Sequence, residues 1–290
     1  MNNKKILIFG GSGFLGKSLA LASIEKGFNV SVFDLKNPEI DDVNFLKGNI
    51  SNPSDFENIG KYDYVINLAA IADIDEADLN FKKTIEVNLI GQINILDFVS
   101  RSNPKRFPFS SSMYVFGNLG GVYGATKRAS EIITQEYSKK YGFDFTFLRY
   151  GSLYGPGSQS WNSIQKYIDD IYKNKKIIHW GTGEEVREYI HIYDAANITI
   201  DSMLDESCKN KALTITGTQK VTSKEVLEMI FEMMELKPVI KFEKKNDINH
   251  YKHSPYNHNF PLTGTKLMPK SHIDFGQGIF ELMREMGIKD

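Results

Sequence analysis

Residues 4–16 read KKILIFGGSGFLG, and this stretch decides the fold. The apolar run over 6–9 is typical of a buried parallel strand, and the glycine-rich loop that follows opens a helix. Gly10 and Gly13 let the backbone turn tightly and approach a pyrophosphate, while Gly16 lets the helix pack closely on the strand. The helix N-terminus then offers free N–H groups and a positive dipole end to the phosphates. The stretch therefore predicts a dinucleotide-binding unit.

The second strand of this unit, over 29–33, ends at Asp34, eighteen residues beyond Gly16. A carboxylate at this place suits the ribose hydroxyls of NAD and repels the 2′-phosphate of NADP. Lys36 leaves NADP open as the alternative, because its cation suits that phosphate. We expect NAD as the cofactor.

Strands and helices alternate along the first half of the chain, which is typical of a parallel sheet with helices on both faces. We expect an α/β fold: a Rossmann-type doubly wound parallel sheet with a smaller C-terminal substrate lobe. The NAD-binding domain would consist of residues 1–150, joined by about 190–215. The substrate-binding lobe would consist of residues 151–189 and 216–290. The further predicted elements are strands over 43–46, 64–70, 106–110, 143–148 and 176–180, and helices over 80–101, 123–141, 163–172, 194–204, 221–236 and 279–286.

Substrates of such folds bind beyond the carboxyl ends of the strands. Asn67, Ser112 and Arg149 lie near predicted strand ends, so we expect them to converge. Tyr123 and Lys127 are four residues apart on a predicted helix and share one face. A cation about 4 Å from the phenol would be worth roughly 4 kcal/mol, or about three pKa units. Such a tyrosine is a general base for a sugar or alcohol hydroxyl.

Composition excludes several classes of function. The formal net charge of the 290 residues is −1, which gives no strong electrostatic case for nucleic acid or an anionic membrane. No apolar run reaches membrane-spanning length. Cys208 is the single cysteine, so internal disulfides and thiolate zinc clusters are excluded, and a reducing cytoplasm is expected.

Taken together, the motifs resemble those of the extended short-chain dehydrogenase/reductases, in the NAD-dependent epimerase/dehydratase family that acts on nucleotide sugars. The resemblance covers residues 4 to about 205 well. It is carried by the glycine loop, Asp34, NLAA over 67–70, NLIG over 88–91, SSS over 110–112, YGATK over 123–127, LRY over 148–150, YGPG over 154–157 and REYIH over 187–191.

The resemblance implies roles for individual residues. Tyr123 is the base and acid, Lys127 holds the nicotinamide ribose and tunes Tyr123, and Ser112 hydrogen-bonds the reacting oxygen. Arg187 would sit at the nucleotide phosphates, with an ion pair to Glu184 or Glu185 as its alternative. The implied cofactor-binding residues are Gly10, Gly13, Phe14, Leu15, Gly16, Asp34, Asn49, Ile50, Leu68, Ala69, Ala70, Asn88, Lys127 and Tyr150. The implied substrate-binding residues are Ser111, Ser112, Met113, Tyr123, Ser152, Trp180 (core packing being its alternative), Arg187 and Tyr251.

Several positions depart from the family pattern. Dehydratases carry an Asp-Glu pair after the catalytic Ser or Thr, and here Met113 and Tyr114 replace it, which argues against dehydration and decarboxylation. Only ten residues separate Ser112 from Tyr123, which leaves a roomier sugar pocket. Asn49 and Ser152 replace the usual Asp and Asn. The histidine-rich segment 250–256 lacks carboxylate partners at metal-ligand spacing, so a substrate-side loop is expected there, and no metal.

We therefore expect an NAD-dependent nucleotide-sugar 4-epimerase acting through a transient 4-keto sugar. A 4-dehydrogenase or 4-ketoreductase with a single hydride transfer is the alternative, because both need the same residues. A non-catalytic dinucleotide-binding regulator would be expected to lose Tyr123 or Lys127, and both are present. By resemblance the helices over 80–101 and 123–141 form a dimer interface, so a homodimer is expected.

Overall fold

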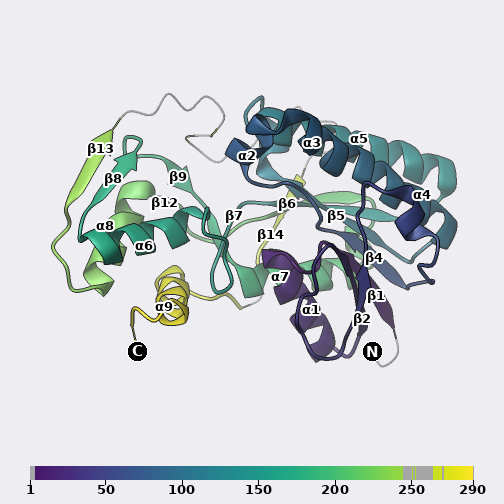
Figure 1. The fold of residues 1–290 in the computed structure, drawn as a ribbon, viewed down its shortest axis with the longest axis horizontal. Helices are drawn as coiled ribbons and strands as arrows, with labels where there is room; N and C mark the ends of the chain where they lie inside the picture. The colour runs from purple at the N-terminus through teal and green to yellow at the C-terminus, as the bar shows by residue number, and fades with distance from the viewer. Residues whose placement is uncertain (1–3, 244–249, 251, 253–263, 270, 290) are drawn as a thin grey trace.

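An eight-stranded parallel sheet forms the centre of the protein in the computed structural model, which describes residues 4–243, 250, 252, 264–269 and 271–289 (Figure 1). The strand order is β14-β11-β6-β5-β4-β1-β2-β3, and each neighbouring pair is parallel. The expected Rossmann-type α/β fold is confirmed. The strands are β1 (Lys5–Phe9), β2 (Asn29–Asp34), β3 (Val43–Lys47), β4 (Tyr64–Asn67), β5 (Phe107–Ser112), β6 (Phe145–Tyr150), β11 (Lys211–Ile215) and β14 (Gly264–Leu267).

Helices cover both faces of this sheet (Figure 1). On one face α1 and α7 pack against each other and against the even-numbered side chains of β1, such as Ile6 and Ile8. On the other face α4 and α5 cover Leu7 and Phe9. Both faces of β1 are thus buried, as its unbroken apolar run predicts. These helices are α1 (Phe14–Glu25), α2 (Ile74–Leu79), α3 (Phe81–Ile85), α4 (Gly91–Ser102), α5 (Gly121–Tyr141) and α7 (Ile192–Leu204).

The single helix expected over 80–101 is interrupted. Glu86–Ile90 form a π-helical turn between α3 and α4. Asn88 in this turn is buried, and its side chain bonds both the N–H and the carbonyl of Ile71, at 2.8 and 3.0 Å. The π turn therefore fixes the loop that follows β4, a contact that periodicity along the chain does not reveal.

The smaller lobe has its own hydrophobic core, built from Ile164, Ile168, Leu227, Phe231 and Leu282 among others. It lies beside the carboxyl end of the sheet (Figure 1). Its elements are β7 (Ser152–Tyr154) paired with β10 (Tyr189–His191), β8 (Ile177–Trp180) with β13 (Ile240–Glu243), β9 (Val186–Arg187) with β12 (Val221–Thr222), and the helices α6 (Ser163–Asn174), α8 (Ser223–Met233) and α9 (Phe275–Glu285).

Three expectations for this half are wrong in detail. The helix expected from residue 221 begins at Ser223, because Thr222 caps it in a reciprocal capping box with Glu225. The last helix begins at Phe275, where Asp274 accepts bonds from two backbone N–H groups. Residues 264–267, which the expected boundaries assign to the lobe, form β14, and this strand extends the large sheet beside β11. None of the helices in the described ranges is long and apolar enough to cross a membrane.

Candidate active site

The glycine loop joins β1 to the N-terminus of α1. Gly10 has φ of +77°, and a Cβ there would lie 2.5 Å from the backbone nitrogen of Ala69. A Cβ on Gly16 would collide with the carbonyl oxygen of Gly10. Gly13 is the N-cap of α1 and gives no side-chain cap, and a Cβ on it would meet only the Gly10 oxygen, at 3.4 Å. An uncapped helix N-terminus behind an open glycine fits a dinucleotide pyrophosphate.

Asp34 ends β2 beside this loop. Its carboxylate accepts hydrogen bonds from the backbone N–H groups of Ser12, at 3.0 Å, and Leu35, at 2.7 Å. Asp34 therefore fixes the glycine loop as well as presenting a carboxylate where the sequence places the ribose. The hydrogen bond between Ser12 and Asp34 joins residues that are 22 apart in the chain.

The remaining residues expected at the cofactor surround the same edge of the sheet. Leu68 and Ala69 lie directly against Gly10, and Ala69 donates its N–H to the side chain of Asn67, at 2.9 Å. The Asn49 side chain accepts from the N–H of Ser51, at 2.9 Å. The other expected cofactor residues that are buried in the structure are Leu15, Gly16, Ile50, Asn88, Lys127 and Tyr150, while Phe14 and Ala70 are half-buried.

Ser112, Tyr123 and Lys127 come together at the carboxyl end of β5. Ser112 ends that strand, and its hydroxyl oxygen accepts from the N–H of Tyr114, at 3.3 Å. Tyr123 lies in the first turn of α5, whose N-terminus is bound by Asp78 of α2 through the N–H of Val122, at 3.0 Å. These residues therefore lie at the end of one strand and at the start of one helix.

The Lys127 amine is buried and donates to the carbonyl oxygen of Ser110, at 2.7 Å. Its Nζ lies 4.9 Å from the ring centre of Phe109 and 5.8 Å from that of Tyr123. Burial lowers the pKa of Lys127 to about 7, and the attraction of Glu131 only partly opposes this. From the sequence we expect about 4 Å between the amine and the phenol, whereas the structure gives 5.8 Å between Nζ of Lys127 and the ring centre of Tyr123. At that distance and an effective dielectric constant of about 20, a charged amine would stabilise a phenolate by roughly 3 kcal/mol.

A buried ion pair that the sequence did not reveal lies behind this site. Arg149 of β6 donates to Glu131 of α5 at 2.9 and 2.6 Å, and both side chains are fully buried. Ser111 donates its hydroxyl to the same carboxylate, at 2.6 Å. Arg149 and Ser111 are therefore directed into this network, which corrects their expected place at the substrate. A buried salt bridge of this kind is visible only once β5, β6 and α5 are packed together.

Three other expected site residues have side chains that are buried in the protein interior. The Asn67 side chain donates to Gln92, at 2.6 Å, and is buried. Met113 is 1% exposed and packs with Val115 and Phe116. The Tyr150 hydroxyl bonds Thr199 of α7, and burial raises its pKa well above the usual value. Of the three residues expected to converge at the strand ends, Asn67 and Arg149 bond buried partners, and the Ser112 hydroxyl accepts from the N–H of Tyr114.

The substrate-side residues of the lobe lie on its short strands. Ser152 begins β7 and is half-buried. Trp180 ends β8 and is 58% exposed, so core packing is the wrong alternative for it. The Arg187 guanidinium donates to the carbonyl oxygens of Val186, at 3.0 Å, and Lys252, at 3.4 Å. Tyr251 lies outside the described residues.

Glu185 and Glu188, which are close to Arg187 in the chain, each accept several hydrogen bonds. The Glu185 carboxylate accepts from the N–H groups of Thr182, at 2.6 Å, and Gly183, at 3.0 Å, and these bonds help to hold its pKa at about 2 despite partial burial. Glu188 is buried and binds Lys266 of β14, at 2.8 Å, and Thr216, at 2.7 Å. The Glu188–Lys266 pair ties the lobe to the large sheet, and no spacing in the sequence predicts it.

Tyr114, which has no adjacent carboxylate or cation in sequence, meets a histidine in the fold. Its hydroxyl is 3.1 Å from Nδ1 of His250, and Nε2 of His250 is 3.9 Å from Asp75. The rings of Tyr114 and Tyr123 lie edge to face, with their centres 6.2 Å apart. Within the described parts of the chain, no three His, Cys, Asp or Glu side chains form a candidate metal site.

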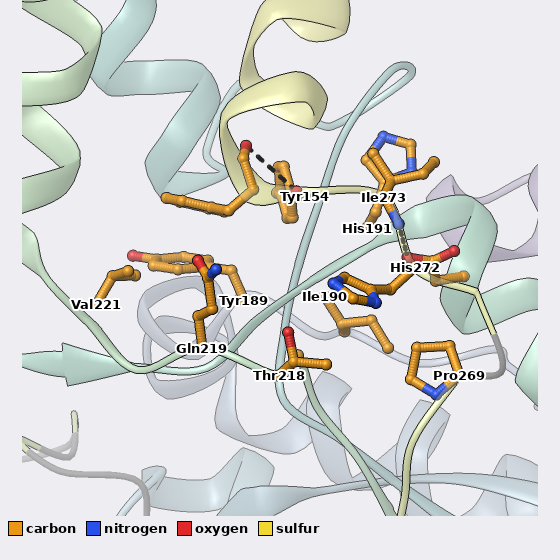
Figure 2. Close-up of a pocket in the computed structure, with 13 residues that line it drawn as sticks. Tyr154, Tyr189, Ile190, His191, Thr218, Gln219, Val221, Pro269, His272 and Ile273 are labelled. Atoms are coloured by element: carbon orange, nitrogen blue, oxygen red, sulfur yellow. Dashed lines mark hydrogen bonds between the residues drawn. The ribbon is translucent and has the colours of Figure 1, made fainter.

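A small pocket elsewhere in the fold holds none of the residues expected at the site. Figure 2 shows Tyr154, His191 and His272 around it, where α7 and α9 begin. Burial lowers the pKa of His191 to about 4, and Nε2 of this histidine lies 3.6 Å from Glu281. The imidazole is therefore neutral at neutral pH and serves packing at this junction.

Comparison with known proteins agrees with this architecture. The NAD dependent epimerase/dehydratase family matches residues 6–212. A dTDP-D-glucose 4,6-dehydratase of Dictyostelium discoideum is 29% identical over 240 residues, which cover 67% of this chain and 55% of that protein. A bifunctional UDP-glucose 4-epimerase and UDP-xylose 4-epimerase 1 of Pisum sativum is 25% identical over 246 residues, 68% of this chain and 70% of that protein.

Solved structures share the fold over almost the whole chain. The UDP-glucose 4-epimerase of Thermotoga maritima superposes with a TM-score of 0.82 at 22% identity, covering 98% of both chains. The UDP-N-acetylglucosamine 4-epimerase of Methanobrevibacter ruminantium gives 0.85 at 22% identity, covering 99% of both. Since the family match spans most of the chain, this protein belongs to the NAD-dependent epimerase/dehydratase family and is an enzyme whose cofactor is NAD.

Proposed function

We propose that this enzyme is a nucleotide-sugar 4-epimerase that acts through a transient 4-keto sugar. One observation carries the proposal: the Lys127 amine bonds the carbonyl oxygen of Ser110 near the end of β5, at 2.7 Å, and lies 5.8 Å from the ring centre of Tyr123. Ser112 is the last residue of the same strand. Only β4 separates this strand from β1, which leads into the glycine loop. The residues for proton transfer and those for NAD therefore share one edge of the sheet.

NAD, when bound, would supply reversible hydride transfer at C4 of the sugar. Tyr123 would take the proton from the C4 hydroxyl, and Ser112 would donate a hydrogen bond to the same oxygen. Tyr123 would give the proton back to that oxygen once C4 is inverted. Because the Lys127 pKa is about 7, its amine changes charge in the range where proton transfer works best. When protonated, the amine stabilises a phenolate at Tyr123.

The lobe supplies the proposed binding site for the nucleotide. Arg187 carries the cation for the diphosphate, the exposed Trp180 offers an aromatic face to the base, and Ser152 and Tyr251 complete the set. Names of relatives point to a uridine or thymidine diphosphate, since those relatives act on UDP- and dTDP-sugars. A cytoplasmic location remains a prediction from the single cysteine.

A homodimer is also part of the proposal. Phe81 on α3 is 56% exposed and Ile132 on α5 is 48% exposed, and Leu79 and Ile90 add apolar surface beside them. Exposed apolar side chains on adjoining helices are typical of an interface. We expect the wild type to sediment as a dimer and Ile132→Asp to sediment as a monomer. A wild-type monomer at micromolar concentration would contradict this part.

The function is tested by incubating the enzyme and NAD with UDP-glucose, UDP-glucuronic acid and dTDP-glucose and following the sugars by NMR. We expect a C4-inverted product with no net formation of NADH. NADH in amounts equal to a released ketosugar would indicate the 4-dehydrogenase instead. Tyr123→Phe should lower turnover by about 10²–10⁴-fold while NAD affinity stays within a few-fold. The matched control is Tyr172→Phe, an exposed tyrosine on α6.

We further propose that no water is eliminated from C5–C6. Elimination needs a proton donor for the C6 hydroxyl, and Met113, at the position where dehydratases carry an acid, is buried and cannot titrate. The same incubations give the measurement. A 4-keto-6-deoxy product, seen as the loss of one water in the mass spectrum, would contradict this proposal.

A further inference from the structure

Tyr114 is held in one position beside the catalytic helix. Its N–H bonds the hydroxyl of Ser112, and its carbonyl oxygen accepts from Arg128 of α5, at 3.0 Å. The ring lies against Gly120, where a Cβ would come within 2.7 Å of a ring carbon. The backbone glycine and the two hydrogen bonds therefore place the phenol edge-on to Tyr123 before any substrate arrives.

The far end of the phenol meets a second acid–base group. The Tyr114 hydroxyl lies 3.1 Å from Nδ1 of His250, and the other ring nitrogen faces Asp75 at 3.9 Å. These three residues come from the turn after β5, from the chain between β13 and β14, and from the start of α2. A tyrosine bonded to a histidine that faces a carboxylate can pass a proton and balance the resulting charge.

Resting on the proposed function, we propose that Tyr114 and His250 form a second proton-transfer site, which exchanges the proton on a carbon next to C4 of the 4-keto sugar. A ketone acidifies the C–H bonds at its neighbouring carbons, so this chemistry becomes available only after Tyr123 and NAD have oxidised C4. The ring centres of Tyr114 and Tyr123 lie 6.2 Å apart, edge to face, so the two phenols are neighbours beside the first turn of α5. We place one bound sugar against both hydroxyl groups.

The step is balanced without any further reactant. The C–H bond breaks, its proton passes to the Tyr114 oxygen, and the Tyr114 proton passes to Nδ1 of His250, whose new charge faces Asp75. The electron pair moves to the C4 oxygen, which receives the proton that Tyr123 took from the C4 hydroxyl. Reversal restores the C–H bond and the ketone, and the hydride then returns to C4.

The experiment runs the epimerase assay in D₂O with NAD and the three sugar nucleotides named above. Plain 4-epimerisation returns the substrate's own hydride and leaves no deuterium on carbon. We expect deuterium on a carbon bonded to C4, located by NMR. Tyr114→Phe keeps the ring and removes the hydroxyl, so the ratio of exchange to hydride transfer should fall by at least tenfold, and His250→Gln should do the same. Tyr172→Phe and His272→Gln are the matched controls.

The outcomes separate this inference from the function on which it rests. Epimerisation without deuterium on carbon, or exchange that both variants retain, overturns the inference and leaves the 4-epimerase standing. A third outcome is that the wild type eliminates water from the sugar and Tyr114→Phe does not. This result supports the second proton-transfer site and contradicts only the proposal that no water is eliminated. A protein that turns over none of the three sugars, with no absorbance of NADH during the incubation, overturns the proposed function and the inference with it.

Discussion

Lys127→Met is expected to make the cofactor-free protein more stable at neutral pH while it abolishes activity. Burial lowers the pKa of the amine from 10.5 to about 7. Between these values the unfolded chain keeps the proton that the folded protein releases, so the unfolded state binds more protons and stability rises with pH. The destabilisation is complete below pH 7, where it amounts to about 5 kcal/mol, and it disappears above about pH 10.5.

The magnitude of the mutational effect follows from two opposed contributions. At pH 7 the buried amine costs about 4 kcal/mol and at pH 9 about 2 kcal/mol. Methionine removes this cost, but it leaves the carbonyl of Ser110 without the donor that now lies at 2.7 Å, which costs about 1–3 kcal/mol. The variant should therefore be more stable by about 1–3 kcal/mol at pH 7 and about equal to the wild type at pH 9.

The assay is urea unfolding of both proteins after removal of NAD, at pH 7, 8 and 9. The difference between the two free energies of unfolding isolates Lys127, because every other titrating group is common to both chains. Lys127→Arg is the control that keeps a cation in the interior and should destabilise at all three pH values. Parallel curves for the wild type and Lys127→Met between pH 7 and 9 would refute the reasoning.

Three further predictions concern the carboxylates. Asp34→Ala should reduce the preference for NAD over NADP in cofactor titrations. Asp34→Asn can still accept a hydrogen bond from Ser12, so it should separate the loss of charge from the loss of the loop contact. An unchanged preference in both variants would count against a contact between Asp34 and the ribose. Arg149→Met should lower the free energy of unfolding by about 3–5 kcal/mol, because the Glu131 carboxylate stays buried without its partner. Adding Glu131→Gln to this variant should recover part of the lost stability. A loss below about 1 kcal/mol in Arg149→Met would show that the pair is not buried as described. Glu281→Gln should change thermal stability at pH 7 by no more than about 1 kcal/mol, because His191 is neutral there, and a larger loss would indicate a charged histidine.

The local signals in the sequence were enough for the fold and for the proposal of Tyr123 and Lys127 as site residues. A strand, a glycine loop and a helix must be consecutive to present an uncapped helix start to a phosphate, so residues 4–16 specify that unit without help from distant parts. Tyr123 and Lys127 share a helix face through the 3.6-residue repeat alone. The place of Ser112 at the end of a parallel strand is likewise predicted from the sequence, because substrates of such folds bind beyond the carboxyl ends of the strands.

Only the tertiary structure decided which polar groups are buried and what they bind. The sequence predicts Ser111 and Arg149 as site residues. In the packed structure of β5, β6 and α5, both side chains instead bond the carboxylate of Glu131. His250 lies 136 residues from Tyr114 in the chain, and no local pattern encodes that contact. Periodicity and capping act over one helical turn or one strand, so they determine elements. Desolvation and long-range hydrogen bonds arise only when elements pack, and for that reason the pKa of Lys127 and the surroundings of Tyr114 belong to the folded protein alone.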